Sequence, residues 1–362
     1  MSSGKRGRRQ RGLSLVLLLG SVNAGCVNLR PPPTPLAASA VGDAPAPVWT
    51  ARAGRRFTSP LVHRDNLLYG GSIDRKVYAI DLAGGEVRWA RRLSGMLLGG
   101  VLVAGETVYA ATSRPQGRIY ALRREDGRAL WQTNTGPIGA PLALIAGLLV
   151  GENQQGEVLG LDPATGKIRW KRRVGVARIA AVPAGDTGLL VATTDSLVRL
   201  SLADGKVIQR APSPGTIVSP WIAVAGNLVA GTTDSQVVSI DPRTLRHQWS
   251  VRVDAPVLAS PAALGDTLFL ATRIGTVYRI VAGSDPVSRR LVGLDWPVTT
   301  PVSILAGEII LGGADGTIRA LRTDGKELWR VRVWRPVEIG PVPTADGLVA
   351  VGGNGDLHRY RQ

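Results

Sequence analysis

Short alternating runs of apolar and polar residues recur along most of this chain. In the clearest runs, apolar residues occupy every second position, a turn rich in Gly, Asp or Pro follows, and a second alternating run ends in Trp. These runs are Val77–Trp89, Ile119–Trp131, Val158–Trp170, Val237–Trp249 and Ile318–Trp329. Because successive side chains of a strand point to opposite faces, each run predicts a β-hairpin. A second pair of apolar runs precedes each hairpin, as in residues 219–231, so each repeat predicts four short strands.

The Trp residues that end these hairpins count the repeats. They are Trp49, Trp89, Trp131, Trp170, Trp249 and Trp329. Neighbouring members lie about 40 residues apart, except for two gaps of about 80 residues, in which Gln209 and a residue near Arg289 stand where a Trp is expected. Eight repeats of about 40 residues are typical of the four-stranded blades of a propeller. Since a buried Trp contributes strongly to packing, the blade with Gln209 is expected to be the loosest.

The two ends of the repeated region complement each other. The last repeat supplies only three strands before Gln362, whereas residues 47–53, with Trp49, form an isolated strand of the outer type. Joining the two closes a ring and removes the unpaired sheet edges between the first and last blades. The sequence therefore predicts an all-β fold over residues 47–362: an eight-bladed β-propeller of four-stranded antiparallel blades, closed by the N-terminal strand. Seven blades and a linear solenoid are the alternatives, although a solenoid requires polar end caps that the sequence does not show.

The first 25 residues are interpreted as a signal peptide. A basic stretch at residues 5–11 precedes the apolar run Leu13–Leu19, which is too short to span a bilayer as a helix. Small residues then lead to Cys26, in a pattern that resembles a bacterial lipobox, although Asn23 stands where that pattern prefers Leu. We expect Cys26 to be lipidated, and residues 26–46, which are rich in Pro, to serve as a tether. An ordinary signal peptide followed by an incidental Cys is the alternative.

The chain carries a formal net charge of +17, and Arg recurs at one place in the repeat. The positions three residues after each Trp place are Arg52, Arg92, Asn134, Arg173, Pro212, Arg252, Val292 and Arg332. An odd offset along a strand points away from the Trp, so these Arg side chains are expected to share one face or rim. They predict either a cationic surface for an anionic partner or, as the sequence alone favours, charges that prevent edge-to-edge aggregation.

Candidate catalytic and metal-binding residues are few. His63, His247 and His358 occupy different places in their repeats and show no metal-ligand spacing, and a single Cys excludes an intrachain disulfide. The chain contains neither a G-x-S-x-G motif nor a phosphate-binding loop that ends in Gly-Lys-Ser/Thr. Most acidic residues of the repeats fall in the hairpin turns, where Asp favours turning by bonding to its own backbone. We therefore predict no catalytic residues, no metal site and no cofactor.

The repeats resemble those of the PQQ-type propellers. The resemblance rests on the Y-A-L-D…G-x-x-x-W pattern, which reads here as residues 78–89 and, with Asp-Pro at its turn, as residues 162–170, and it covers about residues 47–362. Within that group, a lipoprotein leader, a Pro-rich tether and a single eight-bladed body are most similar to the BamB lipoproteins. That resemblance implies a non-catalytic, monomeric scaffold in the cell envelope, anchored in the outer membrane and facing the periplasm.

The same resemblance implies a partner. BamB-like proteins dock on the barrel-forming subunit of the machinery that inserts β-barrel proteins into the outer membrane, and no nucleic acid is implied. A propeller scaffold or sensor of another envelope complex is the first alternative. A PQQ-dependent dehydrogenase is the second, although such enzymes are larger and hold their quinone with a Ca²⁺ site and, in many cases, a vicinal disulfide.

Overall fold

The computed structural model describes residues 44–114, 117–298, 300–333 and 336–361, with only the backbone of Glu338. The signal peptide, Cys26 and the tether up to residue 43 lie outside the described residues. The described parts form 32 strands, and they contain no helix of the length and apolar character needed to cross a membrane. The strands make eight separate four-stranded sheets, so the sequence predicted the right class of fold and the right number of blades.

Each blade has an innermost, a second, a third and an outermost strand. The innermost strands are β2 (Val62–Arg64), β6 (Val101–Ala104), β10 (Ala143–Ile145), β14 (Val182–Pro183), β18 (Ile222–Val224), β22 (Ala262–Leu264), β26 (Ser303–Leu305) and β30 (Val337–Thr344). The second strands are β3 (Leu67–Gly71), β7 (Thr107–Ala111), β11 (Leu148–Glu152), β15 (Gly188–Ala192), β19 (Asn227–Gly231), β23 (Thr267–Ala271), β27 (Glu308–Gly312) and β31 (Gly347–Gly352).

The third strands are β4 (Lys76–Asp81), β8 (Arg118–Arg123), β12 (Glu157–Leu161), β16 (Ser196–Ser201), β20 (Gln236–Ile240), β24 (Thr276–Val281), β28 (Thr317–Leu321) and β32 (Asp356–Arg361). The outermost strands are β5 (Val87–Arg92), β9 (Ala129–Asn134), β13 (Ile168–Arg173), β17 (Val207–Pro212), β21 (His247–Arg252), β25 (Val287–Gly293), β29 (Glu327–Arg332) and β1 (Pro47–Arg52). Blades 1 to 7 follow the chain from β2–β5 to β26–β29, and blade 8 contains β30, β31, β32 and β1.

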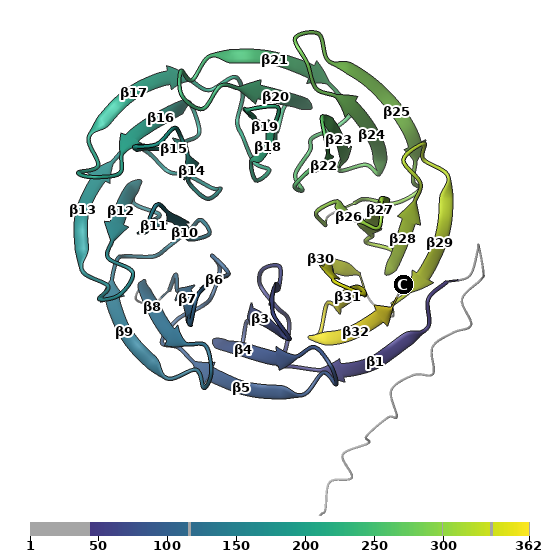
Figure 1. The fold of residues 1–362 in the computed structure, drawn as a ribbon, viewed down its shortest axis with the longest axis horizontal. Coiled ribbons are helices and arrows are strands. Elements are labelled where there is room, and N and C mark those ends of the chain that lie inside the picture. The colour runs from purple at the N-terminus through teal and green to yellow at the C-terminus, as the bar shows by residue number, and fades with distance from the viewer. Residues whose placement is uncertain (1–43, 115–116, 299, 334–335, 362) are drawn as a thin grey trace, which may run out of the picture. The chain divides into compact units, whose positions relative to one another are not determined.

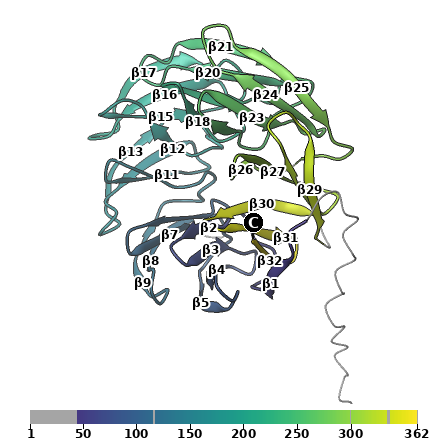
Figure 2. The same ribbon diagram turned by 45° about the vertical axis from the view of Figure 1, so that its right-hand side comes forward.

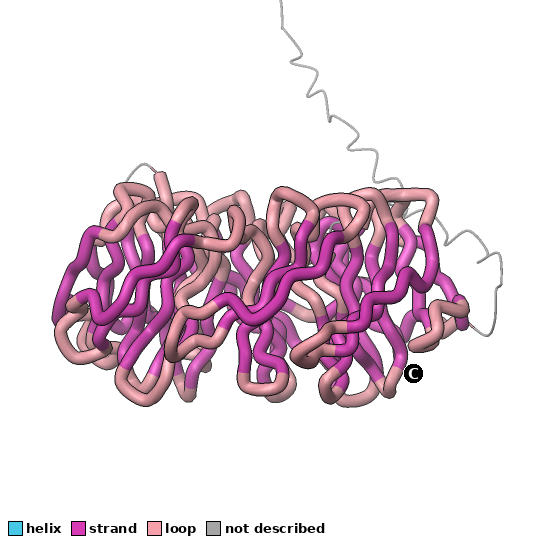
Figure 3. The backbone as a smooth tube through the Cα atoms, turned by 90° about the horizontal axis from the view of Figure 1, so that it is seen from above, coloured by secondary structure: helices cyan, strands magenta, loops and turns pink. Residues whose placement is uncertain are grey.

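The blades are arranged in a ring around a central axis, with the outermost strands on its circumference (Figure 1). Every strand is antiparallel to its neighbour, so all outermost strands end on the same side of the ring. That side, here called the connection face, carries the segments that link each outermost strand to the next blade and the turns between second and third strands. The opposite side, the turn face, carries the two other turns of each blade. Figure 3 shows the strands running between these two loop-bearing sides.

The hydrophobic core lies between neighbouring blades. Tyr69 and Val77 of blade 1, for example, pack with Val108 and Leu122 of blade 2, and all four are buried. The same arrangement recurs around the ring, because alternate side chains of the second and third strands project from both faces of each sheet. Each blade is therefore stabilised by its two neighbours, and an open end would expose one apolar face.

The Trp residues connect each blade to the next one. We call the interface between two neighbouring blades a seam. In four successive seams, from Trp49 to Trp170, the indole packs on a Gly in the last turn of the following blade, and that Gly has positive φ. A Cβ on Gly127 would lie 2.6 Å from the ring of Trp89, so only Gly fits there. The indole N–H also donates to a carbonyl of the same turn, at 2.9 Å in the case of Trp89 and Arg124. The Gly and the Trp of the repeat thus belong to one contact between two blades.

The seam with Gln209 keeps this contact in another form. Where the following blade would have the Gly, it has Leu245, which is buried and keeps a positive φ of 54°. Gln209 Nε2 donates to the Thr244 carbonyl oxygen at 2.7 Å, as the indole does elsewhere. A smaller residue on one side of the seam is therefore matched by a larger one on the other.

Candidate docking face and ring seam

The five Arg residues singled out in the sequence lie at the connection face. Each is the last residue of an outermost strand, and each is exposed: Arg52 of β1, Arg92 of β5, Arg173 of β13, Arg252 of β21 and Arg332 of β29. The antiparallel order of the blades thus places these five guanidinium groups along one edge of the ring. We call this set the Arg rim.

The three other blades depart from the Arg rim in different ways. In blade 2 the position holds Asn134, whose Oδ1 accepts a hydrogen bond of 2.8 Å from Arg118 Nε. Blade 4 has Pro212 there, at the end of β17. In blade 6, counting three residues on from Arg289 leads to Val292, which is one residue short of the strand end. There Gly293 pairs with the first residue of β24, because the bulge of β25 falls after the Trp place, whereas in blades such as blade 1 it falls just before the Trp.

The connection face also exposes large apolar side chains. Six of the fourteen exposed large hydrophobic residues of the described chain lie in its loops, whereas none of the fourteen lies in a turn of the turn face. The six are Ile73, Met96, Leu98, Val176, Leu258 and Ile274. They range from 41% to 53% exposed. The periodicity of the strands could not reveal them, because each lies in a loop outside the alternating pattern.

Exposed apolar side chains on the same face as exposed Arg are typical of a protein-binding surface. Arg is enriched in protein interfaces, and apolar anchors that become desolvated supply much of the binding energy. Scattered apolar residues alone are normal on a protein surface. The informative feature here is that the exposed apolar residues found in loops all lie on one face, the face that carries the longer inter-blade connections.

Glu152 is a buried carboxylate at the interface between blades 3 and 4. It ends β11 at a place where β3, β19 and β27 have Gly, and a Cβ on Gly71 or Gly231 would contact the next blade. Glu152 is 3% exposed, and neither carboxylate oxygen makes a hydrogen bond of good geometry. Burial raises the pKa of Glu152 to about 8, with a smaller opposing contribution from the Ala181 backbone amide. Nothing in the sequence pattern indicated this role, because Glu next to a turn usually faces solvent.

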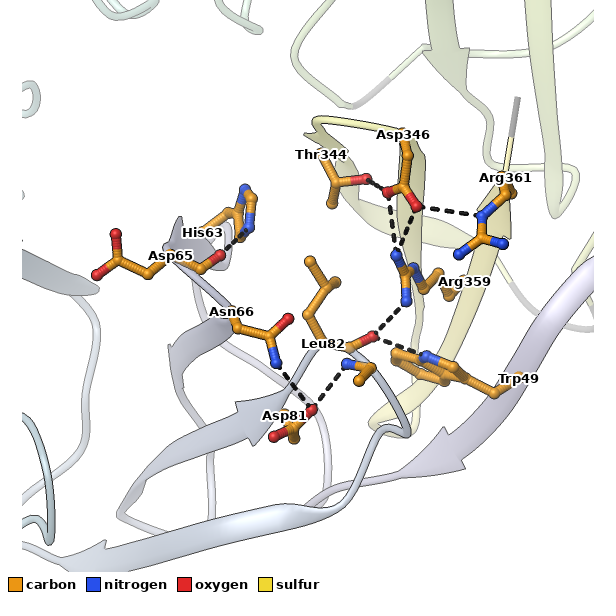
Figure 4. A network of polar contacts seen from close by, with 11 residues as sticks. Trp49, His63, Asp65, Asn66, Asp81, Leu82, Thr344, Asp346, Arg359 and Arg361 are labelled. Atoms are coloured by element: carbon orange, nitrogen blue, oxygen red, sulfur yellow. Dashed lines mark hydrogen bonds and ion pairs between the residues drawn. The ribbon is translucent and has the colours of Figure 1, made fainter.

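The seam between blades 8 and 1 is where the two ends of the described chain meet. β1 is the antiparallel neighbour of β32, with Arg52 opposite Asp356, and Figure 2 shows the two strands side by side. On the turn face, the carbonyl oxygen of Leu82 accepts hydrogen bonds of 2.9 Å from both Trp49 Nε1 and Arg359 Nη1 (Figure 4). One carbonyl of blade 1 therefore contacts both strands of the closing pair.

Arg359 anchors this seam from a buried position. Its guanidinium also donates to both carboxylate oxygens of Asp346, at 3.0 and 2.9 Å, and Arg361 Nε donates to the same group at 3.1 Å (Figure 4). The hydrogen bond from Arg359 holds the pKa of Asp346 below its usual value. Arg359 thus links the last strand of the chain to the first blade and to a turn of its own blade.

The described histidines and turn carboxylates do not gather into a metal site. Within the described residues, no three His, Cys, Asp or Glu side chains lie together as potential metal ligands. His63 Nε2 lies 2.7 Å from the Asp65 carbonyl oxygen, and burial lowers the pKa of His358. The turn Asp residues accept backbone N–H bonds as expected, for example Asp162 from Ala164 and Asp241 from Arg243. These carboxylates have structural partners within their own turns.

Comparison with known proteins decides the family. The family described as outer membrane protein assembly factor BamB matches residues 39–181 and 154–286, which together are more than half of the chain. The chain belongs to the BamB family. BamB of Burkholderia pseudomallei is 23% identical over 345 residues, which cover 87% of each chain. BamB of Pseudomonas aeruginosa is 30% identical over 201 residues, which cover 50% of this chain and 51% of that protein.

Solved structures share the same propeller. BamB of Moraxella catarrhalis superposes with a TM-score of 0.75 at 16% identity, covering 88% of this chain and all of that one. A quinohemoprotein alcohol dehydrogenase from Pseudomonas putida superposes with a TM-score of 0.67 at 12% identity, covering 87% and 76%. Since an assembly factor and an enzyme both match, these likenesses establish the fold alone.

Proposed function

We propose that this protein is a non-catalytic scaffold that supports the assembly of β-barrel proteins into the outer membrane. The observation that carries the proposal is the unequal distribution of exposed residues between the two faces: the Arg rim and six exposed apolar side chains lie on the connection face. In this proposal the connection face docks on a protein partner, and the barrel-forming subunit of the assembly machinery is that partner. Membership of the BamB family supports this choice.

A binding role also agrees with the chemistry of the side chains. The carboxylates that the repeats share are held by backbone N–H groups of their own turns, which leaves them poorly placed for acid–base work. The dehydrogenase alternative is supported only by a shared fold, and fold alone does not imply function.

Charge reversal of the Arg rim tests the proposal. Arg92→Glu, Arg173→Glu and Arg252→Glu, combined in one variant, are expected to abolish co-purification of the barrel-forming subunit from solubilised outer membranes. These side chains are exposed, so each substitution should change the free energy of unfolding by no more than about 0.5 kcal/mol. A second variant, Leu258→Ser with Ile274→Ser, should weaken the same interaction without any change in charge.

A matched control lies on the turn face. Arg243→Glu combined with Arg246→Glu reverses charge in an exposed turn of blade 5 and should leave partner capture unchanged. If the Arg rim only prevents edge-to-edge aggregation, the triple variant will bind its partner normally and aggregate when concentrated. Partner capture by the triple variant at both low and high salt would contradict the proposal. Capture of a different envelope protein would favour the alternative scaffold.

A further inference from the structure

The seam between blades 3 and 4 encloses an acidic side chain at a place where the other blades have almost no side chain. Glu152 is the last residue of β11, and the second strands of the other blades end in Gly or Ala. Taking a lone carboxylate out of water is costly unless the group becomes neutral or finds partners. Neither oxygen of Glu152 makes a hydrogen bond of good geometry. In the folded protein the carboxyl group is therefore most stable in its neutral form.

The connection between blades 3 and 4, residues 174–181, is matched to this carboxyl group. In the seam between blades 5 and 6, a Cβ on Gly231 would lie 2.4 Å from the Val257 side chain, so that seam has no room for Glu. The place of Val257 is held here by Ala177, which is buried and makes an isolated bridge with blade 4. The other connections that make this bridge do so with a larger side chain: Phe57, Ile138, Ile217 and Val298. A small residue on one side of the seam therefore leaves room for Glu152 on the other.

The backbone of this connection has few anchors. In the connection between blades 2 and 3, the Gln154 N–H, beside the bridge, donates to the Pro137 carbonyl oxygen at 2.8 Å. No hydrogen bond of good geometry flanks the bridge of Ala177, although all of residues 174–195 are described. The connection is fixed to blade 3 only at its start, where the Val174 N–H donates to the Gly156 carbonyl oxygen at 2.9 Å. A segment with few backbone hydrogen bonds opens locally at a lower cost than the rest of the fold.

No charged side chain compensates a negative charge on Glu152. The strands β10, β14 and β15 contain no charged residue. The other elements around it contribute only charged residues that are exposed or paired with other groups: Glu157, Lys171, Arg173, Arg178, Asp195 and Arg199. Burial is the main cause of the raised pKa of Glu152, and the one opposing contribution comes from the backbone amide of Ala181. Once ionised, the group can be stabilised only by water, which requires the connection to move.

We infer that Glu152 is a proton-operated latch on the connection between blades 3 and 4. When the carboxyl group carries its proton, the side chain stays in the seam and residues 174–181 pack over it. Loss of the proton drives the carboxylate toward water, and the weakly anchored connection opens before the rest of the seam. Val176 and Arg178, both exposed on the connection face, belong to this segment, so the latch changes that face. The inference does not depend on the proposed docking function.

The direction of the response follows from proton linkage. The pKa of Glu152 is raised to about 8 in the closed protein and returns toward its ordinary value of 4.5 once the group is hydrated. Between these values the open form releases a proton that the closed form keeps. The equilibrium constant for opening therefore rises by up to about tenfold for each pH unit. It levels off above about pH 8, where both forms are ionised.

Hydrogen–deuterium exchange of the full chain tests the inference. Exchange in peptides that cover residues 174–181 is followed by mass spectrometry from about pH 5.5 to about pH 8.5, and each rate is divided by the intrinsic rate at that pH. In wild type the corrected exchange is expected to rise at least about tenfold between about pH 5.5 and 7.5. In Glu152→Gln it should change less than about twofold, because no proton is released on opening. Glu157→Gln, which removes a carboxylate that pairs with Lys171, should keep the wild-type rise.

A second variant and an internal control complete the test. Glu152→Gly combined with Ala177→Val rebuilds the pair that Gly231 and Val257 make in the seam between blades 5 and 6, and it should also remove the pH dependence. The connection in that seam, residues 253–261, is the control, because its corrected exchange should stay constant within about twofold. A rise that persists in Glu152→Gln, or an equal rise in both connections, which would indicate global unfolding, overturns the inference. Exchange of residues 174–181 that is independent of pH in wild type also overturns it.

Discussion

At the scale of single residues, Glu152 is a buried carboxylate at a blade interface where the second strands of the other blades end in Gly or Ala. Burial raises its pKa from 4.5 to about 8 in the folded protein. Between these values the unfolded chain releases a proton that the folded chain keeps. The free energy of unfolding must therefore fall as pH rises from about 4.5 to about 8, by up to about 1.4 kcal/mol for each pH unit.

Glu152→Gln should remove this pH dependence. Urea unfolding of the variant is expected to give a higher free energy of unfolding than wild type at pH 8, by a few kcal/mol, and a similar value at pH 4.5. Glu157→Gln is the control, because the pKa of Glu157 is lowered by its hydrogen bond with Lys171 and its loss cannot stabilise the protein in alkali. A wild-type slope that persists in Glu152→Gln would contradict the assignment.

Gln209 and Leu245 should be energetically coupled. Leu245→Gly removes a buried side chain and should cost about 2–4 kcal/mol, whereas Gln209→Trp alone should overpack the seam and cost about 1–3 kcal/mol. Together they recreate the Trp–Gly contact of the other seams. The double variant should therefore be more stable, by about 0.5–3 kcal/mol, than the summed effects of the two single substitutions predict. A double-mutant cycle of unfolding free energies measures the coupling, and strict additivity would show that the two residues act independently.

At the scale of strands and turns, the sequence predicted the strands within each repeat but few of the contacts between neighbouring blades. The Trp spacing and the alternating runs identified the blades, because short runs that alternate between apolar and polar residues are compatible with few structures other than β-strands. Leu245 was not matched with Gln209, because the partners lie in different repeats and the contact exists only in the ring. The exposed apolar side chains of the connection face, such as Ile274, depend on which loops converge, and a periodic pattern carries no such information.

Deleting residues 47–56 should disrupt the last blade. The deletion removes β1, the indole that contacts the Leu82 carbonyl oxygen, and the buried Ala53. β32 would then be an unpaired edge, and Arg359 would lose its neighbour in the seam. We expect aggregation or a large drop in the thermal midpoint, measured by calorimetry. Deleting residues 27–43 instead should leave the midpoint unchanged, and equal melting of the two deletions would argue against closure by β1.

At the scale of the whole molecule, the start of β1 lies on the turn face and its end on the connection face. The residues between Cys26 and Pro47 span at most about 70 Å when fully extended. If Cys26 carries a lipid, the chain enters the body on the side opposite to the Arg rim.

Cys26→Ser should release the protein from membranes. The expected outcome is a wild type in the membrane fraction and a variant in the soluble fraction, with the same thermal midpoint. Intact mass gives the second measurement, because lipidation leaves Cys26 as the modified first residue. An unmodified Cys26 in the mature wild type, or a mature chain that begins after it, would contradict lipidation.

Strand β1 also has a partner that is made very late. Arg52 pairs with Asp356, roughly 300 residues further along the chain. A ribosome adds about 5–20 residues each second, so β1 exists for on the order of 15–60 seconds before β32 has been made. During that time the other seven blades can form, because each takes all four of its strands from one continuous stretch of chain. The first strand to be synthesised is thus the last to find its place, and the ring remains open until the chain is complete.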